Sequence, residues 1–539
     1  MALLRPPKRL SWYLPLQLRL CLSTSASTRA ELFKSVPEQP IPVEGTVKGC
    51  VPDWVNGKLI RNGPGQFEFG DMKYNHYFDG QALLHSFTIQ SGKVTYTSKF
   101  LQSDTYKRNM AANRIVVSEF GTLGVPDPCQ TIFQRFRSYF SSLTDPSHDM
   151  SDNCMVNVYP AGDKYIAATE TDFVHVISPE TLESEERIQL SKHVAVNTAT
   201  AHPHWEPDGT VYNFGFSSGG YTLIKIPPSQ HHVMDKASVL CNVPPKNRLR
   251  PGYNHSFGAT ENYLIFLEQP FQMDISNILR NKILNKGVLA KDFFMWDDNT
   301  QVRFYVVEKN TGKVLDTKFV TSPCLVLHHI NAYEDNGHIV LDVCAHKDGS
   351  AYFTLDVDDL NADARSHHNQ FIVKPKRFVL PIGLLDSTDG GNLVSLDYTT
   401  ATAELQSDGS IMCKPEIISD RDFELPRINY DQYNGKPYQF AYGMSGTFEG
   451  LVKADLKTKK SLFWAEDGCN VSEPVFVGKP GCSQEDEGVI LSAVLQYEEN
   501  KPPFLLVLDA QSFTELSRVE FPGIQMHRDV HGIFVPAKN

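Results

Sequence analysis

Four histidines in separate short motifs are the residues of this chain best suited to binding a transition metal. They are His202 in the sequence AHPH, His255 in YNHSFG, His328 in LHHIN and His531 in DVHG. Neutral imidazole is the commonest metal ligand among side chains, so four such residues could form one site. Because the chain holds 18 histidines, any one of them taken alone is more often an ordinary core or surface residue.

Ligands from four distant segments need a large rigid scaffold, and the sequence predicts one built from strands. Short β-type runs separated by turn signals begin after about residue 45. A hairpin pattern, in which a polar turn with Thr or Ser joins two strands, recurs at residues 177–182, 307–312, 454–459 and 508–513. Recurrent hairpins favour radially repeated sheets, although an array of β-sandwiches would show similar hairpins. The predicted strands include Arg114–Glu119, Lys164–Thr169, Tyr263–Leu267, Phe304–Val307, His338–Val343, Gly488–Val494 and Phe504–Leu508.

The neighbours of the four histidines carry a family resemblance that runs from about residue 40 to the C-terminus. The matching segments, in order, are RNGPG (61–65), HYFDG (76–80), PDPC (126–129), TET (169–171), AHP (201–203), HSFG (255–258), HHINAYED (328–335), SEP (472–474) and HG (531–532). This set resembles the carotenoid cleavage oxygenase family. The resemblance implies an all-β, seven-bladed β-propeller whose long loops and short helices form a cap over an axial Fe(II) ion.

The same resemblance assigns roles to individual residues. His202, His255, His328 and His531 are the implied iron ligands, whereas His204 and His329, their close neighbours, are not. His76 and His85 are expected to be structural. Outer carboxylates that would hold the imidazole rings by their other N–H are Glu170, Glu424 and Glu473, serving three of the four histidines.

Two further residues, Thr169 and Tyr253, are implied to line the reaction cavity. The Thr169 methyl group would point at a vacant iron position, and Tyr253 would line the substrate tunnel, with ordinary core packing as its alternative. For the glutamates, the alternative is a solvated surface charge, because the chain has 63 acidic residues. The surroundings of Glu170 and Glu473 are apolar and strand-like, which favours burial.

The function implied by the resemblance is cleavage of a polyene double bond with dioxygen. The sequence lacks a nucleophile elbow, a phosphate-binding loop and a dinucleotide fingerprint, so hydrolase, nucleotide and NAD chemistry have no support. The MHRDVHG segment (526–532) resembles central cleavers, which cut β-carotene at 15,15′ to retinal, with xanthophylls as further substrates. The QFEFG segment (66–70) resembles eccentric 9′,10′ cleavers instead. Central cleavage is the first expectation; eccentric cleavage, retinoid isomerisation and carotenoid binding without chemistry are the alternatives.

Composition excludes one class of partner and indicates a compartment. The formal net charge of −12 and the absence of a basic block argue against nucleic acid. Residues 1–30 contain five basic residues, no acid and a Ser/Thr-rich end, which is typical of a mitochondrial transit peptide. A secretory signal and a plain disordered tail are the competing interpretations, and a cytosolic location is the alternative. Residues 31–539 are then the oxygenase domain.

Two segments interrupt the β pattern with aromatic and basic residues at helical spacing. They are Pro128–Leu143, which contains Cys129, a candidate acylation site, and Phe271–Leu284. Such segments are typical of helices that lie in a membrane interface, although packing on the propeller core would explain the same spacing. No apolar run reaches 18 residues, so a peripheral membrane contact is expected rather than a spanning helix.

Overall fold

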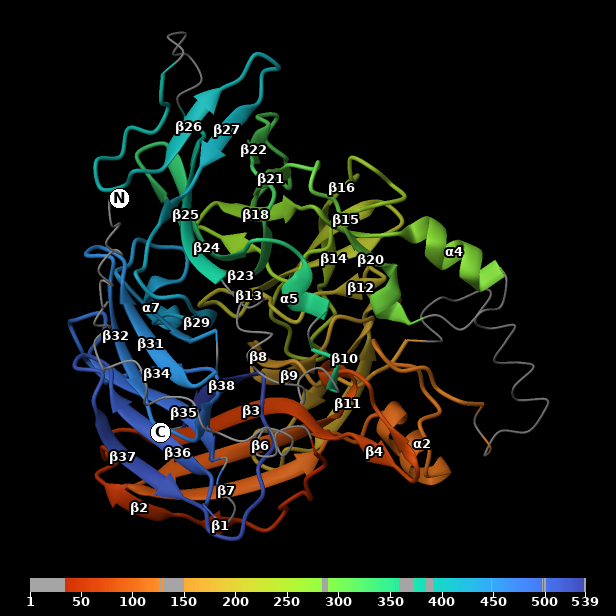
Figure 1. Ribbon diagram of the computed structural model, residues 1–539, viewed down its shortest axis with the longest axis vertical. Helices are drawn as coiled ribbons and strands as arrows, with labels where there is room; N and C mark the ends of the chain where they lie inside the picture. Colours follow the sequence, from red (N-terminus) through yellow and green to blue (C-terminus); the bar gives the residue numbers. More distant parts are fainter. Residues whose placement is uncertain are drawn as a thin grey trace, which may run out of the picture.

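The computed structural model describes residues 34–126, 128, 150–283, 289–353, 355–357, 373–383, 391–446, 448–496, 498 and 501–537. Within these residues, seven sheets of four to six strands surround a central axis as the blades of a β-propeller (Figure 1). The fold expected from the sequence is therefore confirmed. The leader 1–30, Cys129 and the segment Ile132–Leu143 lie outside the described residues.

The ring of blades is closed twice, once by each end of the chain. The C-terminal strand β38 (His531–Pro536) pairs with β3 (Gly57–Gln66) in the first blade. Near the other end, β2 (Thr46–Gly49) pairs with β37 (Glu515–Glu520) in the last blade. Circular closure satisfies sheet edges that would otherwise be exposed, and here it fixes His531 beside an N-terminal strand. The first blade also contains β1 (Val43–Glu44), β6 (Gln81–Gln90) and β7 (Lys93–Phe100).

Blades two to four follow in chain order. The second contains β8 (Asn157–Ala161), β9 (Lys164–Ala168), β10 (Phe173–Ile177) and β11 (Ser184–Gln189). The third contains β12 (Thr198–Ala199), β13 (His204–Trp205), β14 (Val211–Ser217), β15 (Gly220–Ile226) and β16 (Ser238–Val243). The fourth contains β17 (Gly258–Ala259), β18 (Tyr263–Glu268), β21 (Val302–Glu308), β22 (Phe319–Thr321), β26 (Thr402–Leu405) and β27 (Ile411–Lys414).

Blades five to seven complete the ring. The fifth contains β23 (Leu325–Asp335), β24 (His338–His346), β25 (Val373–Pro381) and β28 (Glu416–Ile417). The sixth contains β29 (Glu424–Arg427), β30 (Phe440–Met444), β31 (Gly450–Asp455) and β32 (Lys460–Ala465). The seventh contains β2, β33 (Cys469–Val471), β34 (Val475–Gly478), β35 (Gly488–Gln496), β36 (Phe504–Asp509) and β37.

Apolar packing between adjacent blades forms the core, and β36 shows how. Its residues 505–508 are all fully buried, because the strand lies between two neighbouring blades. Leu505 and Val507 pack in one cluster with Leu59 of the first blade. Leu506 and Leu508 face the other way and pack with residues of the sixth blade. Alternate side chains of one strand therefore stabilise both interfaces.

The four hairpin turns predicted from the sequence share one backbone conformation at their last residue. Each ends in a residue with a left-handed conformation, namely Leu182, Gly312, Lys459 and Phe513, with φ between 58° and 70°. In three of them, the N–H of this residue donates to the carbonyl four positions earlier at 2.8 Å. The turns reverse the chain between strands that run antiparallel, which explains why the pattern recurs in different blades.

Two expectations about local structure were wrong or incomplete. Arg114–Glu119 is not a strand: the amides of Val116 and Val117 donate to the Asn109 side chain instead of to a neighbouring strand. The segment beginning at Phe271 starts as a strand, β19 (Phe271–Met273), before the helix α4 (Ile275–Ile283). The other six predicted strands are present.

Short helices and two small sheets make up the loops around the ring. The helices are α2 (Asp104–Ala112), α4, α5 (Ser350–Phe353), α7 (Tyr430–Tyr433), η2 (Tyr77–Asp79), η4 (Leu190–Lys192) and η5 (Ala290–Phe293). The small sheets are β4 (Glu68–Phe69) with β5 (Met72–Lys73), and β19 with β20 (Phe294–Trp296). In the described residues, none of these helices has the length and hydrophobicity needed to span a bilayer.

Candidate metal centre and its cavity

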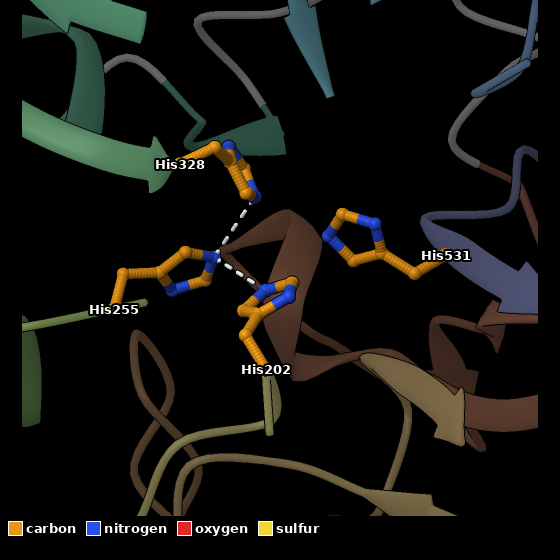
Figure 2. A group of neighbouring side chains, drawn as sticks. All are labelled: His202, His255, His328 and His531. Carbon is orange, nitrogen blue, oxygen red and sulfur yellow. Dashed lines mark hydrogen bonds between the residues drawn. The ribbon is translucent and has the colours of Figure 1, made fainter. Parts of the chain in front are cut away.

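The structure brings the four motif histidines together on the axis of the propeller. His202 lies between β12 and β13, His255 precedes β17, His328 lies in β23, and His531 begins β38. One ring nitrogen from each lies within 4.8 Å of the others, and the rings point toward a common centre (Figure 2). Four different blades therefore each supply one imidazole.

The spacing of the imidazole nitrogens fits a single bound cation. The Nε2 atom of His255 lies 2.8 Å from that of His202 and 3.2 Å from that of His328. Imidazole–metal bonds of about 2.1 Å place two ligands at right angles about 3.0 Å apart. The donor set and its spacing therefore suit one transition-metal ion.

Carboxylates fix the tautomers of three of the rings. His255 Nδ1 lies 2.5 Å from Glu170, His328 Nδ1 lies 2.7 Å from Glu424, and His531 Nδ1 lies 2.7 Å from Glu473. A carboxylate accepts a hydrogen bond, so each Nδ1 carries the proton and each Nε2 keeps its lone pair. Two such lone pairs facing each other repel unless a cation lies between them, which is a second indication of a metal site. Among the described residues, no carboxylate contacts His202.

Burial keeps three of the imidazoles, those of His202, His328 and His531, in the neutral form that binds metal. It lowers the pKa of His202 well below its ordinary value, and the other three rings of the cluster lower it further. It also lowers the pKa of His328, although Glu424 opposes the shift. The pKa of His531 falls to about 4 for the same reason, with Glu473 opposing. For His202, His328 and His531, therefore, no proton competes with a metal near neutral pH.

Glu473 is held in place by two arginines that the sequence motifs did not connect to it. Arg61 donates to it from Nη1 at 2.7 Å, and Arg427 donates from Nε and Nη2 at 2.8 and 3.0 Å. Burial alone would raise the pKa of Glu473, but Arg427, His531 and Arg61 hold it well below its usual range. The carboxylate is therefore ionised and oriented before any metal binds.

Glu424 has a second partner that the sequence also failed to indicate. His346 Nε2 lies 2.7 Å from Oε1 of Glu424, whose other oxygen faces His328. Burial raises the pKa of Glu424, but the two histidines outweigh it and keep the pKa low. His346 is the last residue of β24, and the sequence predicted only the first six residues of this strand.

The histidines expected not to be ligands have other partners. His204 contacts the Tyr430 hydroxyl through Nδ1 at 3.1 Å and the Phe257 carbonyl through Nε2 at 2.8 Å. His329 Nδ1 lies 2.8 Å from the Ser256 hydroxyl. His76 accepts from the Phe78 amide at the start of η2, and His85 bonds the Asp529 carboxylate at 3.0 Å. None of these four belongs to the axial cluster.

A cavity of about 540 Å³ reaches the histidine cluster and is lined mainly by apolar side chains. Thr169 and Tyr253 both line it, as expected. The Tyr253 hydroxyl donates to Glu170 at 2.5 Å, so it also supports the carboxylate that holds His255. Burial and the adjacent Glu170 raise the pKa of Tyr253 well above its ordinary value, so the hydroxyl stays protonated.

Loops outside the ring form part of the cavity wall. Residues Tyr77 of η2, Phe293 of η5 and Tyr352 of α5 contribute to its wall. Phe294, Phe271 and Tyr352 form an aromatic group whose ring centroids lie 4.9–5.4 Å apart. The volume and apolar lining suit a small hydrophobic ligand.

Comparisons with known proteins point to one family. The family model described as "Retinal pigment epithelial membrane protein" matches residues 32–536. A mitochondrial carotenoid-cleaving dioxygenase of Macaca fascicularis is 44% identical over 528 residues, which cover 94% of each chain. A beta,beta-carotene 15,15′-dioxygenase of Rattus norvegicus is 44% identical over 517 residues, covering 93% of this chain and 90% of the relative.

Solved structures share the architecture. An apocarotenoid oxygenase of Synechocystis, in a Glu150Gln mutant form, superposes with a TM-score of 0.74. The alignment covers 95% of this chain and 99% of that one at 20% sequence identity. At this identity, the likeness supports the propeller fold alone.

Proposed function

The chain belongs to the retinal pigment epithelial membrane protein family, and on that premise we propose that it is an iron dioxygenase that cleaves a double bond of a carotenoid. The observation that carries the proposal is the axial group of four histidines, which opens into a mainly apolar cavity. The relatives' names supply the substrate class, since two sets of them, 42–44% identical to this chain, are named as carotenoid-cleaving or β-carotene dioxygenases.

His202, His255, His328 and His531 would hold Fe(II). Burial keeps His202, His328 and His531 neutral, and this fits a divalent transition metal. Carboxylates fix the tautomers of His255, His328 and His531, so that each Nε2 could bind the ion. When bound, the iron would supply a site at which dioxygen is activated. Glu170, Glu424 and Glu473 would keep three of the rings in place by accepting from Nδ1.

The remaining work of the protein would be to position the polyene and exclude water. The aromatic wall formed by residues such as Phe294 and Tyr352 offers dispersion contacts along an extended hydrocarbon. Thr169 and Tyr253 both line the cavity. Tyr253 donates to Glu170, the carboxylate beside His255, and Thr169 precedes Glu170 in the chain, so both would limit how closely the chain of double bonds approaches. The reacting bond would then depend on the positions at which the cavity walls stop the two ends of the polyene.

Central 15,15′ cleavage of β-carotene to retinal is our first candidate for the reaction. It is supported by the C-terminal segment 526–532 and by the 15,15′-dioxygenases of rat and chicken, both 44% identical. Eccentric 9′,10′ cleavage is the second candidate, favoured by the segment 66–70. Relatives named mitochondrial carotenoid-cleaving dioxygenases are as similar to this chain as the 15,15′-dioxygenases are. Overall identity does not separate the two groups.

Peripheral contact with a membrane would give the enzyme access to its water-insoluble substrate. Helix α4 is flanked by cavity-lining residues, Met273 before it and Ala290 after it. Leu249 and Leu279 are 53% and 51% exposed. The Leu249 carbonyl accepts a hydrogen bond from the amide of Ile275, which begins α4 and lies four residues before Leu279. The leader 1–30 and the mitochondrial relatives support delivery to mitochondria.

Mass analysis of the products tests the proposal. Iron-loaded protein incubated with β-carotene or zeaxanthin should release retinal or 3-hydroxyretinal if the central bond is cut. Longer apocarotenals with the matching ionones would identify the 9′,10′ bond. No cleavage of any carotenoid by iron-loaded protein would contradict the function and favour a binding protein, whereas isomerised retinol from a retinyl ester would favour an isomerase.

A further inference from the structure

One buried arginine in the cavity wall has no anionic partner among the residues that the structure describes. Three arginines are buried in the described part of the chain: Arg61, Arg377 and Arg528. Arg61 is paired with Glu473 and Asp529, and Arg377 is paired with Asp342 through two hydrogen bonds. Arg528, which is 8% exposed, has no ion pair within the described residues.

The contacts of Arg528 position its guanidinium but leave most of its N–H donors without a good acceptor. The guanidinium carbon lies 3.8 Å from the ring centre of Phe448 and 6.0 Å from that of Tyr77. Nη2 is 4.0 Å from the Met444 sulfur, which is a weak acceptor, and the buried Nε has no hydrogen-bond partner in the described part of the chain. The aromatic rings fix the plane of the group, and most of its five N–H donors stay available.

The location of Arg528 makes it part of the substrate cavity. Arg528, Phe448 and Tyr77 all line the same space as the histidine cluster. Arg528 also precedes His531 by three residues, so their Cα atoms lie within about 11 Å of one another. The adjacent carboxylate, Asp529, is directed to Arg61 and His85 and does not neutralise Arg528.

We propose that Arg528 is a specificity-determining residue that donates hydrogen bonds to an oxygen on the end group of the carotenoid. This inference rests on the proposed function. A desolvated cation without an acceptor is costly, so a ligand that brings an oxygen to it gains a charge-assisted hydrogen bond. A pure hydrocarbon such as β-carotene offers no acceptor. A ring hydroxyl or a terminal aldehyde does, and these two sources of the oxygen can be separated by experiment.

The test compares substrates that differ only in their oxygen. Arg528→Met removes the donors and the charge and keeps an unbranched apolar side chain. Its kcat/KM on zeaxanthin, which carries ring hydroxyls, and on an apocarotenal, which carries an aldehyde, is measured against β-carotene. We expect the ratio of oxygenated to hydrocarbon substrate to fall at least about tenfold. A fall for zeaxanthin alone identifies the hydroxyl as the partner, and a fall for the aldehyde alone identifies the carbonyl.

Arg303→Met is the matched control. Arg303 also stacks on an aromatic ring, 4.3 Å from the centre of Tyr305, and its Nε likewise has no partner, but it does not line the cavity. Its substitution should leave the substrate ratio unchanged. An equal change in both variants, or an equal loss on all substrates in Arg528→Met, would overturn the assignment.

Binding to metal-free protein separates this inference from the proposed function. Dissociation constants for zeaxanthin and β-carotene, measured by fluorescence quenching, should show the same loss of preference in Arg528→Met. Arg528→Lys keeps a charge but not the planar guanidinium, so it should lose part of the preference for zeaxanthin. This variant provides the test if Arg528→Met does not fold. Unchanged preference in a folded variant contradicts the role of Arg528, whereas absent cleavage by the parent enzyme contradicts only the function.

Discussion

Arg427 donates hydrogen bonds from Nε and Nη2 to Glu473 at 2.8 and 3.0 Å, and the same carboxylate lies 2.7 Å from Nδ1 of His531. Bidentate pairing with a planar guanidinium fixes the orientation of a carboxylate as well as its charge. Arg427 also donates to the carbonyl of Gly532 at 2.5 Å, so it contacts both the carboxylate and the backbone beside His531. The position of one imidazole therefore depends on an arginine from another blade.

Arg427→Met should weaken iron binding without unfolding the protein. Removing an outer partner of a metal ligand typically reduces metal affinity or activity ~10–100-fold. Iron affinity and turnover are measured beside the control Arg421→Met, whose guanidinium stacks on Phe463 at the surface. Parent-like iron affinity and turnover in Arg427→Met would show that Arg61 alone suffices to hold Glu473.

Gly532→Ala should displace His531. A Cβ at this position would lie 2.1 Å from the carbonyl oxygen of Ile60 and 2.9 Å from the Cα of Arg61, so backbone must move. Overpacking of this kind typically costs about 1–3 kcal/mol, and the shift of β38 should also reduce bound iron. Gly478→Ala, whose nearest neighbour is 3.5 Å away, is the control for thermal midpoint and iron content. A variant of Gly532 that keeps both at parental values contradicts the close approach of β38 to β3.

Stability should decrease as pH falls between about 6.5 and 4, in part because of His76. Burial lowers the pKa of His76 to about 4. The charge of Asp356 raises this pKa by less than burial lowers it, and the charge of Lys291 lowers it further. Between the two pKa values, the unfolded chain binds more protons than the folded one, so acid favours unfolding. The stabilisation is complete above pH 6.5 and amounts to about 3 kcal/mol.

His76→Gln should therefore flatten the acid side of the stability curve. Glutamine retains a hydrogen-bond acceptor near the Phe78 amide but does not titrate. Unfolding midpoints are followed from pH 7 to pH 4 in both proteins. If the parent and the variant lose stability in parallel over this range, His76 is not the titrating group.

Leu249→Ser with Leu279→Ser should reduce binding to anionic liposomes. Each exposed leucine that enters the apolar layer contributes about 1.5–3 kcal/mol, so the double change should move protein from the pellet to the supernatant. Leu405 and Leu462, similarly exposed on the outer strands β26 and β32, provide the matched control pair. Equal sedimentation of both double variants and the parent would place the membrane contact elsewhere.

The sequence predicted the histidine cluster because each ligand candidate lies in a recognisable local motif. Its supporting residues could not be predicted in the same way. Arg61 reaches Glu473 across 412 positions of the chain, and His346 reaches Glu424 across 78, so no local pattern links them. Closure of the ring packs the first blade, which holds Arg61, against the seventh, which holds Glu473, and so makes the first of these contacts possible.

Local patterns also failed where side chains replaced a strand partner. Ile115, Val116 and Val117 are buried and resemble part of a strand, but the Asn109 side chain binds two amides of this segment. Hydrophobicity identifies burial in such a segment and does not identify its hydrogen-bond partners. The sequence places Arg528 in the motif MHRDVHG but gives no sign of its surroundings. Only the structure shows that it lines the cavity and has no counter-ion among the described residues.

Iron content of purified histidine variants tests the central claim most directly. The parent should bind about one iron per chain, and His202→Ala, His255→Ala, His328→Ala and His531→Ala should each lose most of it together with carotenoid cleavage. His204→Ala and His329→Ala, which alter the neighbouring histidines outside the cluster, should retain the metal. Full iron stoichiometry after His531→Ala, or loss of iron only in the two control variants, would contradict the four-histidine site.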